Sequence, residues 1–315
     1  MALFDSLGRW LWKRQGSHRQ WYRPLFKRLS RRADADYPFQ ADFFGLRYDG
    51  NLNNNIDYAV YYFGAFEKPV LFFLRDTLTS LVPEGDRCFI DIGANVGQHT
   101  LFMSNHACRV HAFEPYPPVR DVLVSRVLNN NIENVSIHPV GLSDANASLP
   151  FYAPTGRNKG IGSFDQSSVA KGNQPIGELQ LVKGDDFLET LELEKIHLIK
   201  MDVEGFEKPA LRGLSQTLAK HRPVIVFELT YDGELSFKSM EDVLETLPAD
   251  YELYVFVSRD ANGRRARSRN ARARVTGEYQ LAPVTEWRST GQDDLVAVPA
   301  ESREALAGVL NRKSI

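Results

Sequence analysis

The chain has 315 residues, of which 43% are hydrophobic and 25% are charged. These proportions are typical of a globular protein with one large domain and appendages, or with two domains, and they exclude collagen-like, disulfide-scaffold and wholly disordered chains. Only Cys88 and Cys108 are present, so neither a disulfide framework nor a cysteine-based zinc site is expected. No apolar run approaches the roughly 20 residues that cross a bilayer, and charged residues interrupt the N-terminus where a signal peptide is apolar. We therefore expect a cytoplasmic protein.

Charge is distributed unevenly along the chain. Residues 1–32 hold nine Lys and Arg against one Asp, and residues 259–274 hold seven Arg against one Asp, although the net charge of the chain is −2. The remaining residues therefore carry −16. The first segment interleaves its basic residues with tryptophan, tyrosine and leucine, which fits either a membrane surface or a solvated arm packed on the domain. We expect a basic amphipathic arm at 1–32 with peripheral membrane contact, and a long exposed loop at 259–274.

Beyond residue 85, short β-rich runs alternate with helical runs. Strands are predicted at 87–92, 110–114, 135–140, 197–203, 224–229, 251–257 and 294–298, and helices at 98–105, 119–129, 184–191 and 209–220. This alternation predicts βαβ units and a parallel sheet covered on both faces, with any ligand site at the carboxyl ends of the strands. No helix separates the last two strands, which predicts an antiparallel pair at the end of the sheet.

The segment 89–97, Phe-Ile-Asp-Ile-Gly-Ala-Asn-Val-Gly, ends the first of these strands and opens a helix. Gly93 and Gly97 permit a tight turn and a close backbone approach to a ligand, and the helix start suits an anionic group. Asp91 stands before the glycines, where a carboxylate can accept bonds from loop amides or hold a cationic ligand group. A dinucleotide fingerprint has glycine where this chain has Asn95, which disfavours NAD.

Glu114 lies at the predicted carboxyl end of the second strand, seventeen residues after Gly97. An acid at this place binds the two hydroxyls of a ribose in dinucleotide sites, and the alternative is a solvated strand-end carboxylate. Asp144, after the third strand, could accept a bond from an adenine amino group, although Ser143-Asp144 also fits a plain turn. With a glycine loop that lacks a pyrophosphate clamp, these residues indicate S-adenosylmethionine as the cofactor in preference to NAD.

Lys200, Asp202 and Glu204 alternate along the fourth predicted strand and so share one side of it. Two acids at this edge can orient a substrate hydroxyl, take its proton or bind a divalent cation, whereas the alternative is a structural Lys–carboxylate pair. Glu228 ends the fifth strand beside them, and His99 follows the glycine loop closely enough to touch ligand or substrate. No His-x-x-x-His or similar spacing supports a metal. We therefore expect no metal and assign Asp202 and Glu204 as catalytic, with Asp202 as the acceptor of the hydroxyl proton.

Together these motifs resemble the FkbM family of S-adenosylmethionine-dependent methyltransferases. The resemblance covers residues 88–230, and Gly64-Ala-Phe-Glu67 is similar to a stretch that precedes this domain in some members. It implies an α/β fold with a Rossmann-like class I methyltransferase sheet of seven mostly parallel strands, the last antiparallel, after an N-terminal helical arm and cap. The matching stretches are Phe89-Ile-Asp-Ile-Gly-Ala-Asn-Val-Gly-Gln-His-Thr100, Phe113-Glu-Pro115, Gly141-Leu-Ser-Asp144, Gly160-Ile-Gly-Ser-Phe164 and Ile199-Lys-Met-Asp-Val-Glu-Gly205.

The chain is accordingly divided into a basic arm (1–32), a cap subdomain (33–85), a methyltransferase domain (86–300) and a C-terminal tail (301–315). The resemblance implies that Asp202 and Glu204 face the methyl acceptor. It also implies that six residues surround the cofactor: Asp91, Gly93, Asn95, Gly97, Glu114 and Asp144.

The expected activity is methyl transfer to a hydroxyl, commonly of a sugar in a glycan or glycolipid, or of a polyketide-type secondary metabolite. The two basic segments add the hypothesis that the acceptor is a lipid-linked sugar at a membrane face, because phosphate-bearing carriers attract arginine. Two alternatives stay open: a nucleic-acid methyltransferase that grips phosphates with its arginines, and a non-catalytic binding module that retains the fold.

Overall fold

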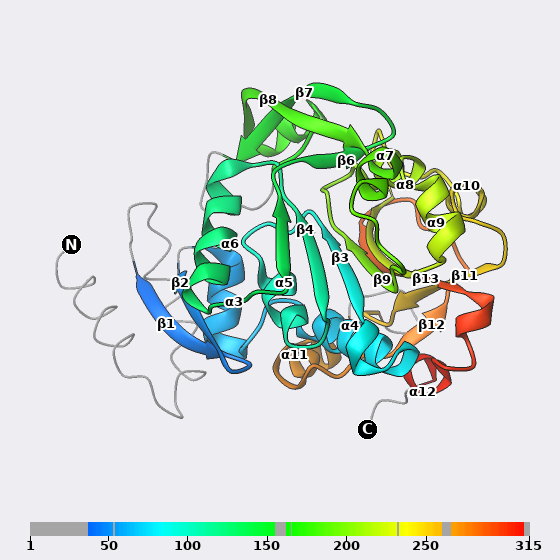
Figure 1. Cartoon of the computed structure of the whole chain (residues 1–315), viewed down its shortest axis with the longest axis horizontal. Coiled ribbons are helices and arrows are strands. Elements are labelled where there is room, and N and C mark those ends of the chain that lie inside the picture. Colours follow the sequence, from blue (N-terminus) through cyan, green and yellow to red (C-terminus); the bar gives the residue numbers. More distant parts are fainter. Residues whose placement is uncertain are drawn as a thin grey trace.

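The computed structural model describes residues 37–52, 54–154, 162–164, 166–231, 233–259 and 266–311 (Figure 1). The predicted basic arm at 1–32 lies outside these ranges, as do residues 260–265 of the arginine-rich segment. Within the described ranges, no helix combines the length and the apolar character that crossing a bilayer requires.

Eight strands form the central sheet, in the order β12-β11-β13-β10-β9-β3-β4-β5. Strand β3 pairs in parallel with β4 and β9, whereas β13 pairs antiparallel with both β10 and β11. The predicted mostly parallel sheet with an antiparallel last strand is thus confirmed, and β12 is an addition to the seven predicted strands. The strands are β3 (Cys88–Ile92), β4 (Arg109–Phe113), β5 (Val135–His138), β9 (Leu198–Met201), β10 (Val224–Thr230), β11 (Tyr251–Phe256), β12 (Leu281–Pro283) and β13 (Gln292–Pro299).

Alternate residues of the central strands enter two different hydrophobic cores. Phe89 of β3 packs with the helices on one face, Ile90 packs with those on the other, and both side chains are fully buried. This two-sided burial is the reason for the nearly continuous apolar run in β3. The first face carries α4 (Lys68–Leu81), α5 (Gln98–Ser104) and α6 (Pro117–Asn129), and the second carries α7 (Gly184–Glu189), α8 (Glu207–Arg212), α9 (Ser215–His221) and α10 (Met240–Thr246).

The single helix predicted at 209–220 is in fact two helices, α8 and α9. They meet at Gly213, where a Cβ atom would lie 1.7 Å from the carbonyl oxygen of Ser143. The chain must pass this close to another strand, so the helix is interrupted at a residue without a side chain.

The residues before the sheet form a hairpin and two helices. The hairpin pairs β1 (Pro38–Phe43) with β2 (Leu46–Asn51) in antiparallel register, and α3 (Asn55–Phe63) follows before α4. Phe43, Tyr48 and Phe73 are fully buried in the same core as the first face of the central sheet. The leading segment therefore packs directly on the sheet, and the predicted domain division at residue 85 stays a prediction.

A buried ion pair joins this leading segment to α6. Arg126 Nη2 lies 3.0 Å from Asp57 Oδ1, and the two side chains are 3% and 8% exposed. Tyr48 donates its hydroxyl hydrogen to the same oxygen at 2.7 Å, and Arg126 Nη1 donates to the carbonyl oxygen of Val96 at 2.7 Å. Since Val96 belongs to the glycine loop, the leading segment helps to hold that loop in place.

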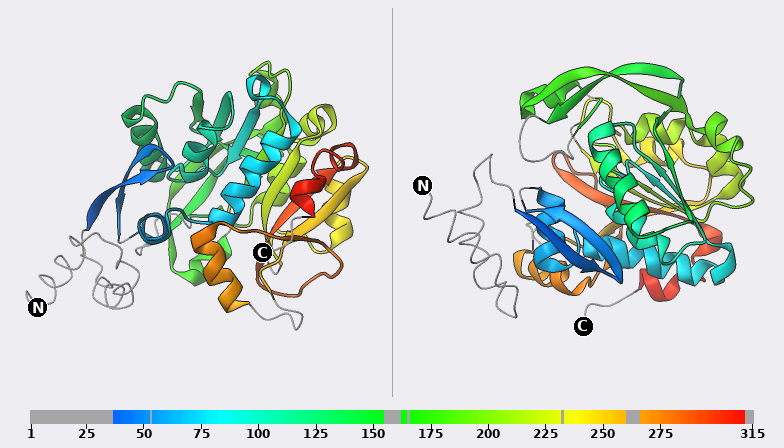
Figure 2. Two further views of the ribbon diagram at one scale, coloured as in Figure 1. Left: turned by 90° about the horizontal axis from the view of Figure 1, so that it is seen from below. Right: turned by 60° about the vertical axis from the view of Figure 1, so that its left-hand side comes forward.

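A second, three-stranded sheet stands over the carboxyl edge of the central strands (top of Figure 1; Figure 2). It has the order β6-β8-β7, with β6 (Gly141–Ser143), β7 (Ala147–Pro154) and β8 (Asn173–Lys183). Phe151 of β7 packs against Tyr116 with ring centroids 5.1 Å apart, and Ser163 Oγ donates to the carbonyl oxygen of Glu204 at 2.9 Å. These contacts place the small sheet beside the ends of β4 and β9.

The arginine-rich segment contains a helix, α11 (Arg267–Thr276), so the prediction of a loop throughout 259–274 is wrong. Arginine and alanine favour a helix even without an apolar stripe, and Gly277 ends it with φ = +78°. Lys68 Nζ donates to the carbonyl oxygen of Val275 at 3.0 Å, so α11 lies beside the start of α4 (Figure 1). No residue of α11 is buried, and its arginines form an exposed basic surface.

The remaining helical segments are short. They are the 3-10 helices at Glu84–Asp86, Gln166–Lys171 and Ala300–Ser302, and α12 (Ala307–Leu310) near the C-terminus.

Candidate active site

The glycine loop between β3 and α5 is held by close contacts with the rest of the protein. Gly93 and Gly97 have φ values of +79° and +83°, which favour glycine. A Cβ on Gly93 would lie 1.9 Å from the carbonyl oxygen of Asp202, and one on Gly97 would lie 2.3 Å from Leu123 Cδ1. Both glycines are required by packing against neighbouring elements, and the predicted close approach to a ligand stays a prediction.

Glu114 lies at the end of β4 and is bound to this loop. Its Oε2 accepts the backbone N–H of Asn95 at 2.9 Å, and its Oε1 accepts that of Tyr116 at 2.8 Å. The residue is only 7% exposed, and burial raises its pKa to about 7 although the two amides lower it. Glu114 is therefore a buried carboxyl group, and each of its oxygens keeps a lone pair that can accept a further hydrogen bond.

Asp91 is fully buried in β3, just before the glycine loop. Its Oδ2 accepts the hydroxyl hydrogen of Thr100 at 2.6 Å, whereas its Oδ1 has no hydrogen-bond partner. Burial raises the pKa of Asp91, and the positive charge of Lys200, opposite it in β9, lowers that pKa. The N–H groups of the loop do not bind Asp91, since Gly93 donates to the carbonyl oxygen of Phe113. This leaves the second predicted role, the holding of a cationic group.

Asp144 lies apart from these residues, in the exposed turn after β6. Its Oδ1 accepts the hydroxyl hydrogen of Ser143 at 3.2 Å, and its backbone nitrogen lies near Gly213. These are contacts of a turn residue, and the contact with adenine stays a prediction.

The next site element, β9, ends at Met201, earlier than predicted. Lys200 Nζ lies 3.0 Å from Asp202 Oδ2, with 6% and 29% of the side chains exposed. Glu204 has φ = +52° and so departs from the strand geometry on which the predicted alternation depends. Burial opposes the charge of Lys200, but the carboxyl groups of Asp202, Asp91 and Glu67 outweigh it and raise the lysine pKa.

Two acids that the sequence analysis did not place at this edge belong to it. Asp294 is the third residue of β13 and pairs with Glu228 of β10 in the antiparallel register. Burial, followed by the negative charge of Asp202, raises the pKa of Glu228 to about 11 and that of Asp294 to about 6. Glu67, at the start of α4, interacts electrostatically with the same group of acids.

We call these five residues the carboxyl cluster: Glu67, Asp202, Glu204, Glu228 and Asp294. Within the described part of the chain, no group of three or more His, Cys, Asp or Glu side chains is arranged to hold a metal ion. Chemically, the cluster can accept hydrogen bonds from hydroxyl groups and can take up protons.

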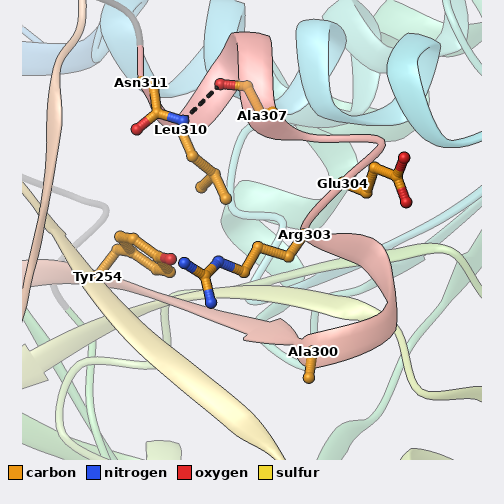
Figure 3. A pocket seen from close by; sticks show the side chains of 7 residues that line it. All are labelled: Tyr254, Ala300, Arg303, Glu304, Ala307, Leu310 and Asn311. Carbon is orange, nitrogen blue, oxygen red and sulfur yellow. Dashed lines mark hydrogen bonds between the residues drawn. The ribbon is translucent and has the colours of Figure 1, made fainter.

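A separate pocket of about 450 Å³ lies between β11, the end of β13 and α12 (Figure 3). Because β13 is antiparallel to β10, its end lies at the edge opposite to Asp294 and the carboxyl cluster. The pocket is therefore not part of this site. Its lining residues are Tyr254, Ala300, Arg303, Glu304, Ala307, Leu310 and Asn311.

Comparison with known proteins shows the family of this chain. The FkbM methyltransferase domain model matches residues 91–256, which is more than half of the chain. The chain belongs to the FkbM methyltransferase family. The resemblance inferred from the motifs is thereby confirmed, and with it the expectation of a methyltransferase.

Three curated relatives overlap with this chain to different degrees. Methyltransferase 1 of Beauveria bassiana is 28% identical over 237 residues, which cover 64% of this chain and 95% of that protein. The hexuronic acid methyltransferase AglP of Haloferax volcanii is 32% identical over 157 residues, covering 48% of this chain and 61% of that protein. The 2-O-methyltransferase NoeI of Sinorhizobium fredii is 26% identical over 184 residues, covering 53% of this chain and 74% of that protein.

Proposed function

We propose that this FkbM methyltransferase transfers a methyl group from S-adenosylmethionine to a hydroxyl group of a sugar in a glycan or glycolipid. The observation that carries the proposal is Glu114, whose carboxyl group is buried and bound through two amides beside the glycine loop. The names of two relatives support the acceptor class, since AglP is called a hexuronic acid methyltransferase and NoeI a 2-O-methyltransferase.

The residues of the site fit this cofactor. Asp91 Oδ1 is a buried oxygen without a hydrogen-bond partner, which suits the ammonium group of the methionine moiety. Glu114 has lone pairs for the two ribose hydroxyls. When bound, S-adenosylmethionine supplies an electrophilic methyl group on its sulfonium.

The protein's own contribution is mainly alignment. When the protein holds the acceptor hydroxyl in line with the methyl group, the two groups react as quickly as they would at a very high concentration of the acceptor. The carboxyl cluster, at the ends of β9 and β10 and the starts of β13 and α4, accepts the hydroxyl hydrogen and orients the acceptor oxygen.

Cofactor affinity should depend on pH through Glu114. Its pKa is about 7, and ribose hydroxyls donate to its ionised form, so the affinity for S-adenosylhomocysteine should rise as pH increases from about 6 to about 8. Glu114→Gln should lower the affinity roughly 10- to 100-fold, as expected for hydrogen bonds to a charged group, and remove the pH dependence. Calorimetric titration at several pH values measures both effects.

NAD and Asp144→Ala serve as controls in the same titration. NAD should not bind, and Asp144→Ala should weaken binding only if the predicted adenine contact exists. Folded protein that does not bind S-adenosylhomocysteine, or whose Glu114→Gln variant binds as tightly as the wild type, would contradict the proposed cofactor site.

We further propose that the protein works at an anionic membrane surface on a lipid-linked acceptor. The support is charge: residues 1–32 carry nine Lys and Arg, and α11 exposes four arginines without a buried residue. Each basic residue near an anionic bilayer contributes about 1 kcal/mol.

Binding to vesicles tests this second proposal. The full chain should sediment with vesicles that contain phosphatidylserine and not with pure phosphatidylcholine, and deletion of residues 1–32 should abolish the binding. The triple variant Arg267→Gln, Arg269→Gln, Arg274→Gln should bind vesicles more weakly. Arg303→Gln, at the edge of the central sheet opposite to the carboxyl cluster, should bind them as the wild type does. An intact protein that ignores anionic vesicles would rule out the membrane contact.

A further inference from the structure

Glu67 occupies a position that is unfavourable for its residue type. It precedes α4 with φ = +46°, a left-handed conformation that disfavours residues with a Cβ atom. Its side chain makes no capping hydrogen bond to the helix. Glycine or asparagine would suit this backbone better, so the helix start does not explain the glutamate.

The backbone around Glu67 is firmly held. The Phe66 N–H donates to Gln98 Oε1 at 2.5 Å, and Gln98 Nε2 donates to the Phe66 carbonyl oxygen at 2.9 Å. Gln98 is the first residue of α5, directly after the glycine loop. A two-point contact thus fixes the backbone next to Glu67 relative to the glycine loop.

The Glu67 side chain faces titratable groups from three other elements. His99 of α5 places its Nε2 3.8 Å from Glu67 Oε2, and this nitrogen is buried without a hydrogen-bond partner. Lys200, Asp202 and Glu204 face it from the end of β9, and Asp294 faces it from β13. His99 has only 9% of its side chain exposed, whereas 29% of the Glu67 side chain is exposed. A bound acceptor can therefore reach Glu67 but not His99.

Two other nearby acids, Asp202 and Glu207, are less suited to accept a proton. Asp202 is already engaged, because its Oδ2 accepts a hydrogen bond from Lys200 Nζ at 3.0 Å. Glu207 is only 2% exposed, and its Oε1 accepts the N–H groups of Val203 and Gly205. By contrast, burial and the neighbouring carboxylates raise the pKa of Glu67 well above its ordinary value, which strengthens it as a base.

We propose that Glu67, supplied by the segment before the sheet, is the catalytic base of the methyl transfer, and that His99 is a positioning residue behind it. The proposal rests on the methyltransferase function proposed above. The acceptor oxygen forms a bond to the methyl carbon while the carbon–sulfur bond breaks and its electron pair remains on sulfur. The proton of the acceptor hydroxyl passes to a carboxylate oxygen of Glu67, and it returns to solvent after product release.

The test uses Glu67→Gly in the full chain, because glycine adopts the left-handed backbone without strain. The melting temperature should stay unchanged or rise, and the affinity for S-adenosylhomocysteine should stay within about twofold. Methyl transfer should fall roughly 10²- to 10⁴-fold, the range for loss of a general base. It is measured with the acceptor that the wild type methylates fastest among neutral methyl glycosides. Added formate should restore part of the rate, and Asp202→Asn should retain more activity than Glu67→Gln.

Glu192→Gly is a matched control. Glu192 also has a left-handed backbone, with φ = +49°, and it is exposed in the turn after α7. This variant should show a similar melting temperature to Glu67→Gly but wild-type turnover. In the wild type, turnover should increase as pH rises through the pKa of Glu67. In Glu67→Gly, this increase of turnover with pH should be absent.

The outcomes separate the two proposals. A Glu67→Gly protein that melts well below both the wild type and Glu192→Gly would show a structural role and overturn the catalytic one. Unchanged turnover in Glu67→Gly would overturn it as well. A wild type that binds S-adenosylhomocysteine but methylates none of the glycosides would contradict the sugar acceptor, while the melting comparison still decides whether Glu67 has a structural role.

Discussion

Asp57→Ala is expected to lower the free energy of unfolding by about 3–5 kcal/mol, the cost of leaving one partner of a buried ion pair unpaired. Arg126 is 3% exposed and would keep its charge without the Asp57 carboxylate. Tyr48 and the backbone N–H of Asn51 would lose their acceptor at the same time. Denaturation by urea measures the loss, and cofactor affinity should fall with it because Arg126 also holds the carbonyl oxygen of Val96 in the glycine loop.

Asp49→Ala is the matched surface control. Asp49 pairs with Arg47 at 2.9 Å, but the side chains are 40% and 56% exposed. Exposed pairs of this kind contribute about 0–1 kcal/mol. If Asp57→Ala lowers the free energy of unfolding no more than Asp49→Ala does, the buried ion pair does not stabilise the packing of the leading segment.

Gly93→Ala should destabilise the protein and abolish cofactor binding. Its Cβ would meet the carbonyl oxygen of Asp202 at 1.9 Å, a contact with backbone that no side-chain rotation relieves. The left-handed backbone alone costs alanine about 1–2 kcal/mol, and overpacking adds roughly 1–3 kcal/mol. The end of β9 or the glycine loop must move, and either shift displaces residues of the proposed cofactor site. Thermal melting and titration with S-adenosylhomocysteine measure the two effects.

Gly45→Ala separates the backbone contribution from the collision. Gly45 has φ = +87°, close to the +79° of Gly93, but a Cβ at Gly45 would meet nothing within 4 Å. Gly45→Ala should lose only the stability that the left-handed backbone costs an alanine, and it should bind the cofactor as tightly as the wild type. If Gly93→Ala and Gly45→Ala lose equal stability, the close contact between Asp202 and Gly93 does not exclude a side chain at position 93.

Much of the fold was predictable because the central strands are buried on both faces. The apolar runs at 88–92 and 224–227 exceed what a half-exposed strand shows, and the glycine loop and Glu114 follow directly from strand ends that are easy to locate. The ends of β3 and β4 lie side by side in any such sheet. The residues proposed to bind the cofactor could therefore be predicted from the sequence alone.

The basic helix shows the limit of such reasoning. Residues 267–276 have no apolar periodicity, and the alternating arginines predict an exposed loop equally well. The helix is decided by its contacts at both ends, with Ser258 near its start and with Lys68 near its finish.

By itself, the sequence determined the parallel sheet, the glycine loop and Glu114, because each depends on short-range patterns of burial and turn geometry. Only the tertiary structure showed that Asp294 and Glu67 belong to the carboxyl cluster, where the acceptor is proposed to bind. Asp294 reaches the edge because β13 runs antiparallel, so that the start of this strand lies beside the end of β10. Glu67 reaches it because Gln98 binds the backbone of Phe66, a contact across 32 residues. The antiparallel direction of the last strand was predicted, but the pairing of Asp294 with Glu228 and the contact of Gln98 with Phe66 are set by packing of the whole chain, which no local pattern encodes.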